Sequence, residues 1–175
     1  MRAGITRAHR ARAAVVAVAA AALALLAGGC AMLTPPQPGT QRAAVLQQWG
    51  APTGRYALPD GGERLEYASG PWGRTTWMVD IGRDGRVRGA HQALGEAQFA
   101  DLAARVAGMT PQQVLFELGR PAQVRAVGWQ GGELWSWRYP TNDCLWFQVG
   151  FDRERHATSA GYGIDWSCDP PNDRQ

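Results

Sequence analysis

Residues 108–121, GMTPQQVLFELGRP, contain a complete short helix together with its start and stop signals. Thr110 is a favoured N-cap residue, the proline after it suits the first helical position, and Gln113 completes a capping box. Gly119 is a favoured residue for ending a helix, and the proline two positions later prevents continuation. A shorter version, VLQQWGAP, occurs 69 positions earlier at residues 45–52. The chain therefore contains the same helix-and-stop unit twice.

The repetition extends through the strands that follow each helix. Matching segments occur in order at residues 61–67 and 131–137, and at residues 79–84 and 147–152. The offset between the copies stays between 68 and 70 positions, as short loop insertions would make it. A duplicated unit of this length predicts two tandem α+β modules rather than a solenoid, which would have more and shorter repeats. We place the first module at residues 40–93 and the second at residues 94–175.

Each module is expected to have one or two helices on one face of a three- or four-stranded antiparallel sheet. A helix capped by Thr40 and ending at Trp49 precedes the first sheet, whereas the spacing of Phe99, Leu102 and Val106 adds a second helix to the later module. Alternation predicts which strand residues face the helices. These are Trp77, Val79 and Ile81 in the first module, and Trp135, Trp137, Tyr139, Leu145, Phe147 and Val149 in the second.

Residues 1–29 are interpreted as an export signal. Four arginines precede an uncharged run of 15 residues, Ala13 to Ala27, which is shorter than the roughly 20 residues that a membrane-spanning helix needs. Small residues then lead to Cys30, an arrangement that resembles the lipobox of bacterial lipoproteins. We expect Cys30 to carry the lipid anchor, with residues 30–39 as a proline-rich tether; the alternative is ordinary cleavage that leaves a free thiol.

The charge balance changes once the signal is removed. Four of the 18 basic residues and none of the 15 acidic ones precede Cys30, so the mature chain has 14 basic and 15 acidic side chains. This balance argues against nucleic acid as a partner. Among three cysteines, lipidation of Cys30 leaves Cys144 and Cys168 as a pair, for which we expect a disulfide. A metal site, the alternative, lacks nearby histidine and cysteine partners.

Four side chains are candidates for contact with a partner protein. Trp146 and Arg138 are placed on the sheet face away from the helices, together with Met78 and Asp80 in the first module, and tryptophan and arginine dominate binding interfaces. For Trp146 we favour the alternative, burial by the C-terminal tail. Two more candidates lie in glycine-rich turns, where partner contact and packing onto their own hairpin are equal alternatives. They are Trp72 and Trp129.

No catalytic residue, metal or cofactor is expected. His91 and His156 are isolated on expected strands, without a metal-binding partner at the usual spacing. The chain has neither a Gly-x-Ser-x-Gly elbow nor a phosphate loop after a strand. Asp84 and Asp152 occupy equivalent turns, where aspartate serves the backbone geometry. The protein is therefore not expected to be an enzyme.

A particular succession of motifs carries a family resemblance. Phe99 is followed by Gly-Met-Thr at 108–110, by Leu-Gly-Arg-Pro at 118–121 and by the Trp-Ser-Trp-Arg-Tyr strand at 135–139. The second module thereby resembles the SmpA/OmlA family, the BamE-like outer-membrane lipoproteins, and residues 40–92 resemble it in degenerate form. The family implies a two-layer α+β fold and a lipid anchor at Cys30. BamE has one such module, so the partners of a two-module chain are open.

The resemblance also implies a location and a role. It predicts a lipid-anchored outer-membrane protein that faces the periplasm and acts without catalysis in β-barrel assembly or envelope integrity. Its partners would be envelope proteins, with β-barrel assembly subunits as candidates, and it would meet the membrane through the lipid. Tandem modules of this layout also resemble the β-lactamase inhibitor protein, so inhibition of a periplasmic or secreted enzyme is the alternative. The lipobox favours the anchored role.

Overall fold

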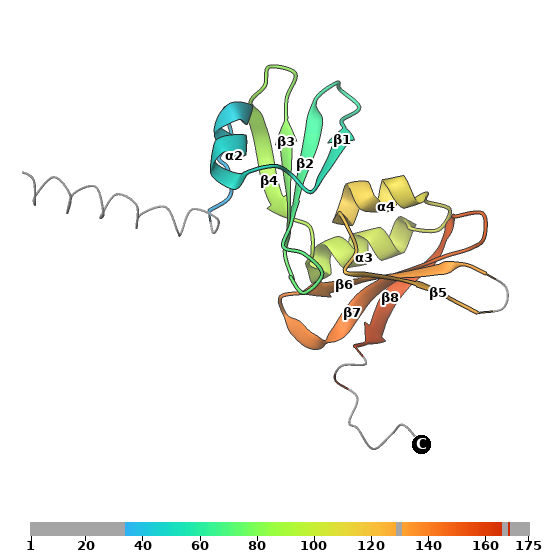
Figure 1. Cartoon of the computed structure of the whole chain (residues 1–175). Helices are drawn as coiled ribbons and strands as arrows, with labels where there is room; N and C mark the ends of the chain where they lie inside the picture. The colour runs from blue at the N-terminus through green and yellow to red at the C-terminus, as the bar shows by residue number, and fades with distance from the viewer. Residues whose placement is uncertain (1–33, 129–130, 166–167, 169–175) are drawn as a thin grey trace, which may run out of the picture. The chain divides into compact units, whose positions relative to one another are not determined.

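A computed structural model describes residues 34–128, 131–165 and 168, and Figure 1 shows its two successive groups of helix and strands. The elements of the first module are α2 (Arg42–Trp49), β1 (Gly54–Ala57), β2 (Glu63–Ala68), β3 (Thr76–Ile81) and β4 (Val87–Gln92). The elements of the second are α3 (Glu96–Arg105), α4 (Pro111–Leu118), β5 (Gln123–Ala126), β6 (Glu133–Tyr139), β7 (Asn142–Phe151) and β8 (Ala157–Ile164).

The strands form two antiparallel meanders, so the predicted α+β fold class is confirmed. One sheet has the order β1-β2-β3-β4 and the other the order β5-β6-β7-β8. Of the three- and four-stranded alternatives, the described part of the chain thus has four strands in each sheet. Helices α2 and α4 begin at Arg42 and Pro111, and the first strands of the two sheets begin at Gly54 and Gln123. Both pairs are 69 positions apart, which is the offset of the sequence repeat.

The ends of α4 follow the sequence prediction. The Thr110 hydroxyl accepts a hydrogen bond from the Gln113 backbone N–H, and the Gln113 side chain accepts one from the Thr110 N–H at 2.8 Å, which completes the capping box. Gly119 ends the helix with a φ of +74°, and its N–H donates to the Leu115 carbonyl. A conformation of this kind is available to glycine and strained for other residues.

The predicted N-cap of α2 is wrong. The helix begins at Arg42, its N-cap residue is Gln41, and no side-chain cap hydrogen bond is present. The Thr40 backbone has another role, because its carbonyl accepts a hydrogen bond from the Val87 N–H at 2.8 Å. Gln41 also forms a β-bridge with Arg86. The segment before α2 is therefore tied to the start of β4 rather than coiled into the helix.

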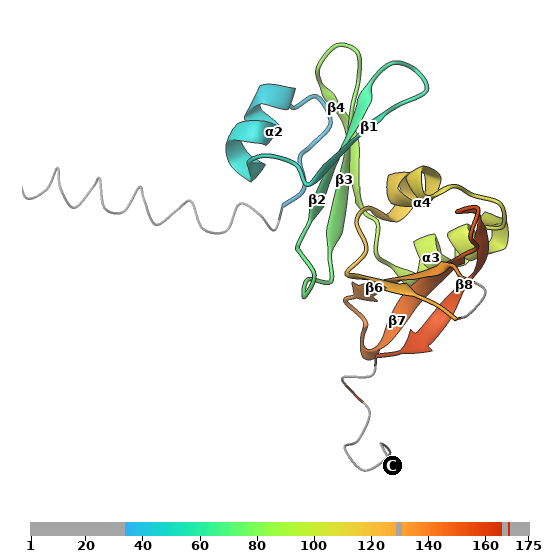
Figure 2. The same ribbon diagram turned by 45° about the vertical axis from the view of Figure 1, so that its right-hand side comes forward.

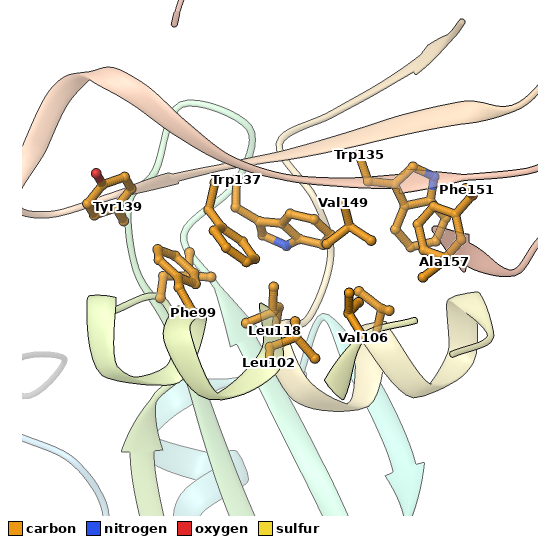
Figure 3. Close-up of a cluster of buried hydrophobic side chains, with 13 residues drawn as sticks. Phe99, Leu102, Val106, Leu118, Trp135, Trp137, Tyr139, Val149, Phe151 and Ala157 are labelled. Atoms are coloured by element: carbon orange, nitrogen blue, oxygen red, sulfur yellow. The ribbon is translucent and has the colours of Figure 1, made fainter. Parts of the chain in front are cut away.

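The core of the second module is large and aromatic (Figure 3). Helices α3 and α4 pack against the sheet, and Phe99 of α3 stacks on Phe147 of β7 with 4.1 Å between ring centroids and nearly parallel planes. Strand residues predicted to face the helices belong to this core: Trp135, Trp137, Tyr139, Phe147 and Val149 are buried, and Leu145 is partly buried. Burial of such side chains is the main favourable term in folding.

The core of the first module is smaller. Its buried residues are Val45, Leu65, Val79, Ile81 and Val87, between α2 and one face of the sheet. Trp77, predicted to face the helix, is half-buried, and its ring meets the edge of Trp49 at 6.2 Å. The alternation in β3 therefore identified the helix-facing side of this sheet correctly.

The opposite face of the first sheet is covered by α4. Arg64 of β2 donates a hydrogen bond to the Phe116 carbonyl at 3.0 Å, and its guanidinium lies 4.1 Å from the centre of the Phe116 ring. Met78 and Asp80 point away from the α2 side, as predicted, but Met78 is fully buried and Asp80 pairs with Arg64. Because Val114 and Leu118 belong to the other core, α4 lies between the two sheets, as Figures 1 and 2 show.

None of the helices in the described residues is long and apolar enough to cross a membrane.

Candidate protein-contact site

Three of the four predicted contact residues come together at the junction of the two modules. Trp72 lies in the turn between β2 and β3, Arg138 in β6 and Trp146 in β7. The Arg138 guanidinium carbon is 4.9 Å from the centre of the Trp72 ring and 4.1 Å from the centre of the Trp146 ring. Both distances are within the range of cation–π attraction. We refer to Trp72, Arg138 and Trp146 as the tryptophan–arginine stack.

The turn that carries Trp72 is held by its own hydrogen bonds. The Ser69 hydroxyl donates to the Thr75 carbonyl at 2.8 Å and accepts from the Thr75 N–H at 3.1 Å. Within the turn, the Gly73 N–H donates to the Gly70 carbonyl at 2.9 Å. These bonds close the loop at its base and across its tip, so the Trp72 backbone has a defined position.

Arg138 fixes this turn to the second module. Its Nη1 donates a hydrogen bond to the Pro71 carbonyl at 2.9 Å, and its Nη2 pairs with the Asp165 carboxylate at 3.1 Å. Asp165 is 2% exposed, so this pair is screened little by solvent. One guanidinium therefore joins the Trp72 turn, the Trp146 ring and the segment after β8.

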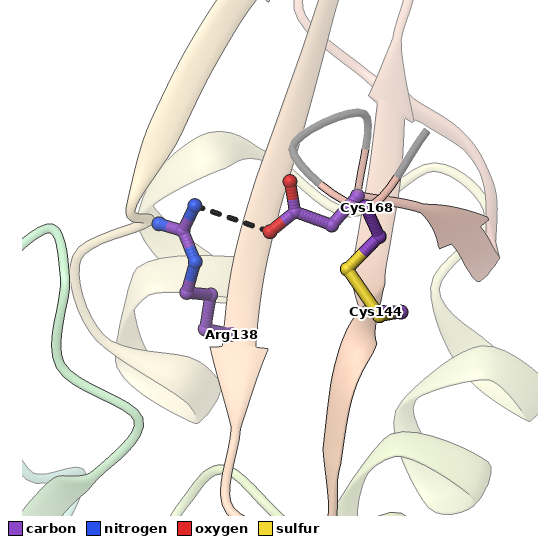
Figure 4. The surroundings of a disulfide bond; sticks show 4 residues. Arg138, Cys144 and Cys168 are labelled. Carbon is purple, nitrogen blue, oxygen red and sulfur yellow. Dashed lines mark hydrogen bonds and ion pairs between the residues drawn. A yellow bond between two sulfur atoms is a disulfide. The ribbon is translucent and has the colours of Figure 1, made fainter. Parts of the chain in front are cut away.

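The segment that carries Asp165 is held by a disulfide, as the cysteine count predicted. Cys144 and Cys168 are joined with 5.6 Å between their Cα atoms, and Figure 4 shows the bond beside Arg138. The Asp165 N–H also donates to the Cys144 carbonyl, and the Cys168 N–H donates to the Asp165 carbonyl, both at 2.8 Å. The disulfide thus helps to position the carboxylate that holds Arg138.

The two tryptophans of the stack differ in exposure. Trp72 is 81% exposed although Arg138 holds one side of its ring, so it does not pack onto its own hairpin. Trp146 is 4% exposed, which agrees with the favoured prediction of burial and contradicts an exposed Trp146 contact. Within the described residues its indole nitrogen has no hydrogen-bond partner. Cys30 and Trp129, for which lipidation and partner contact were predicted, lie outside the described residues.

A cavity of about 260 Å³ lies beside the stack, between the β2–β3 turn and the second sheet. We call it the junction cavity. Arg120 and Arg138 contribute charged groups to its lining, and Leu94, Pro121 and Trp137 contribute apolar ones. Arg120 also crosses to the first module, where its Nη2 donates to the Thr53 carbonyl at 3.1 Å. A second hollow of about 510 Å³ lies between the β1 end of the first sheet and α4.

Three side chains at the junction have unusual surroundings. Glu66 is buried, and its carboxylate accepts hydrogen bonds from the Thr53 and Tyr56 hydroxyls. Burial, and then this hydrogen bond to Glu66, raise the pKa of Tyr56 well above its ordinary value. Burial, and then the Arg64 guanidinium, lower the pKa of His91. The bond between Tyr56 and Glu66 joins β1 to β2.

The remaining histidine and aspartate predictions have mixed outcomes. His91 lies on β4 as expected, but His156 lies in the turn before β8 rather than on a strand. Asp84 and Asp152 do serve turns, because their carboxylates accept hydrogen bonds from the backbone N–H groups of Arg86 and His156. In the part of the chain that the structure describes, no three histidine, cysteine or acidic residues are grouped as metal ligands.

Sequence reasoning missed two residues of this site. Arg120 was noticed as part of a helix-ending motif, but its contact with Thr53 joins residues 67 positions apart. One feature of the sequence could have indicated a position for Asp165 near β7. It lies three positions before Cys168, which was predicted to form a disulfide with Cys144. Neither signal identifies the residue that the side chain contacts, because that contact depends on the packing of the modules.

Comparison with known proteins assigns neither a family nor a function to this chain. No protein-family model matches this chain, and no curated protein sequence matches it significantly. Among solved structures, the chain is similar to a DUF4309 family protein, YjgB, from Bacillus subtilis. The sequence identity is 13%, the match covers 72% of this chain and 79% of that chain, and the TM-score is 0.28. A similarity at this level supports no functional conclusion.

Proposed function

We propose that this protein is an exported, non-enzymatic lipoprotein of the outer membrane that binds another envelope protein through the exposed Trp72 ring of the tryptophan–arginine stack. The observation that carries the proposal is the state of Trp72, which is 81% exposed yet held by Arg138 from the other module. A tryptophan ring with this exposure keeps most of its apolar surface in water, where it adds little hydrophobic stabilisation to the fold. A held ring loses less side-chain entropy on binding than a free one, so it suits contact with a partner.

The chemistry of the stack also supports protein binding. Tryptophan and arginine are enriched among the residues that contribute most to binding energy. Arg138 is fixed by Pro71 and by Asp165, so the surface is formed before a partner arrives. A preorganised surface of this kind loses little conformational freedom on association.

The location and the partner class in this proposal come from the sequence. The lipobox at Cys30 supports anchoring, and the disulfide between Cys144 and Cys168 is consistent with an oxidising compartment. The resemblance of both modules to the BamE-like family supports β-barrel assembly subunits as the partners. Inhibition of a periplasmic or secreted enzyme stays the second candidate, because the exposed Trp72 at a two-module junction would also suit an enzyme surface.

The test is affinity capture from gently solubilised envelopes with the full-length, lipidated protein. Trp72→Ala should lose most of the captured envelope protein, whereas Val124→Ala, a matched control, should retain it. Val124 is an apolar side chain that is 51% exposed on β5 and lies outside the stack. Equal capture by Trp72→Ala and wild type would exclude the stack as the contact surface.

The anchoring part of the proposal has its own arm in this experiment. Cys30→Ala should move the protein from the membrane fraction to the soluble fraction, and unchanged fractionation would exclude a lipid anchor at this cysteine. Capture of β-barrel assembly subunits would support the scaffold role. Recovery of a single soluble enzyme would instead support inhibition and would contradict the envelope-protein partner.

A further inference from the structure

The junction cavity has a charge imbalance that the fold does not neutralise. The residues that line it include two arginines, Arg120 and Arg138, and no aspartate or glutamate. Arg138 is paired with Asp165, but within the described residues Arg120 forms no ion pair and donates to the Thr53 carbonyl alone. A guanidinium has five N–H donors, so Arg120 retains several for a ligand.

The buried carboxylate of Glu66 on the first sheet does not compensate this charge. Glu66 packs against the helix end at Gly119, where it is 1% exposed. Its carboxylate is already bound by the hydroxyls of Thr53 and Tyr56. Glu66 is not among the residues that line the cavity, and the exposed Arg120 is therefore available to an anion.

The size and the apolar lining restrict what could enter. The volume of about 260 Å³ is below the roughly 300 to 1,000 Å³ of sites for drug-sized molecules. Leu94, Pro121 and Trp137 give the cavity an apolar wall, and the Trp137 indole N–H is already bound to the Gly119 carbonyl at 3.1 Å. This combination suits one carboxylate with a short apolar segment behind it.

We propose that the junction cavity binds a carboxylate of a partner's peptide segment, which Arg120 holds while the rest of the segment lies over Trp72. The inference rests on the proposed function, since it names the group that the partner presents beside the stack. Arginine matches a carboxylate with two parallel N–H donors, a geometry that lysine cannot reproduce. The carboxylate belongs either to a free C-terminus or to an acidic side chain, which share this chemistry.

The test uses the disulfide-bonded mature chain and three acetylated peptides. The first is Gly-Ser-Gly-Ala-Leu with a free C-terminus, the second is the same peptide amidated, and the third has an amidated C-terminal glutamate in place of leucine. Binding is followed by intrinsic tryptophan fluorescence and by the NMR shifts of the arginine Nε–H groups. If the cavity binds a C-terminal carboxylate, the first peptide should bind about tenfold or more tightly than the second. If it binds an acidic side chain, the third peptide should show this advantage over the second.

Variants at one position make the assignment specific. Arg120→Gln should weaken carboxylate binding by about tenfold, and Arg120→Lys should restore part of it, because lysine keeps the charge without the bidentate geometry. Arg55→Gln is the matched control, since Arg55 is an exposed arginine on β1 outside the cavity lining. Thermal unfolding of each variant shows whether loss of the bond to Thr53 has unfolded the chain.

The outcomes separate this inference from the proposed function. The cavity assignment is overturned if all three peptides bind equally or if none of them binds. It is also overturned if Arg120→Gln and Arg55→Gln lose binding to the same extent. If envelope capture depends on Trp72 but is unchanged in Arg120→Gln, the carboxylate inference fails while the proposed function stands. Loss of capture in Trp72→Ala and Arg120→Gln, but not in Arg55→Gln, supports both.

Discussion

The two modules share one helix followed by a four-stranded meander, but they differ in what stabilises them. The second has helices of ten and eight residues, a core of 13 buried residues and a disulfide. The first has one helix of eight residues and a core of five buried residues. Its sheet is nevertheless buried on both faces, because α4 of the second module covers the side that α2 leaves open. The smaller module therefore depends on the larger one.

The sharpest test of this dependence is to separate the modules. A fragment of residues 35–93 should fail to fold, because its own helix covers only one face and a chain of about 60 residues is marginal even with a complete core. A fragment of residues 94–175, with its disulfide formed, should fold with reduced stability. Far-ultraviolet circular dichroism with thermal unfolding measures both.

The control for this separation recombines the two fragments. Both fragments mixed in equal amounts should recover helix and strand signal, because α4 then meets the first sheet again. A cooperative unfolding transition in the fragment of residues 35–93 alone would contradict the dependence. Loss of folding in the larger fragment would instead show that each module requires the other.

A smaller effect is expected from two equivalent glycines. Gly50 and Gly119 end α2 and α4 with φ values of +77° and +74° and extended ψ values, a combination nearly confined to glycine. A methyl group on Gly50 would meet nothing within 4 Å, whereas one on Gly119 would lie 2.7 Å from Thr76 Cγ2 and 2.9 Å from Glu66 Cδ. The same cap is thus free in one module and closely packed at the junction in the other.

Alanine at each position separates strain from contact. Gly50→Ala should cost about 1 to 3 kcal/mol through backbone strain alone, and Gly119→Ala should cost about 1 to 3 kcal/mol more because the junction is overpacked. Urea unfolding of the full chain measures the difference. An equal loss of unfolding free energy in the two variants would mean that the end of α4 at Gly119 is not closely packed against the first sheet.

Local signals in the sequence predicted much of each module. The capping box of Thr110 and Gln113 acts within one turn, and the alternation around Val79 and Phe147 reports a strand with one face in a core. The pairing of the cysteines followed from their number and from the expected lipidation of Cys30. The edge strands β1 and β5 have only four residues each, which is too short for an apolar alternation to identify them, so they were not located individually.

The relation between the modules could not be predicted from the same signals. Met78 was assigned to an open face because the sequence does not show that α4 has a second packing surface. The contact of Arg138 with Pro71 joins positions 67 apart. Alternation reports only the faces of a strand, and it does not report which distant element covers each face. The candidate site was therefore predicted as separate residues, and its assembly came from tertiary packing.

The smallest expected effect concerns the pH dependence of the junction. His91 lies on β4 opposite Met78, and Arg64 of β2, Asp80 of β3 and Glu117 of α4 surround it. Burial and the Arg64 charge outweigh the two carboxylates and lower its pKa below the ordinary 6.5. The folded chain therefore favours neutral His91, whereas the unfolded chain begins to bind a proton as the pH falls through 6.5.

This difference stabilises the folded chain above about pH 6.5 and is lost as the pH falls toward the lowered pKa. His91→Gln should remove this contribution, so the variant should lose less stability than wild type between pH 8 and pH 5. The effect is a fraction of the roughly 1.4 kcal/mol that each unit of pKa difference is worth, because solvent screens a half-buried group. Urea unfolding at the two pH values measures it, with His156→Gln, an exposed turn residue, as the control. If both variants keep the pH dependence of wild type, protonation of His91 does not contribute to it, and the stability of the junction does not depend on keeping this side chain neutral.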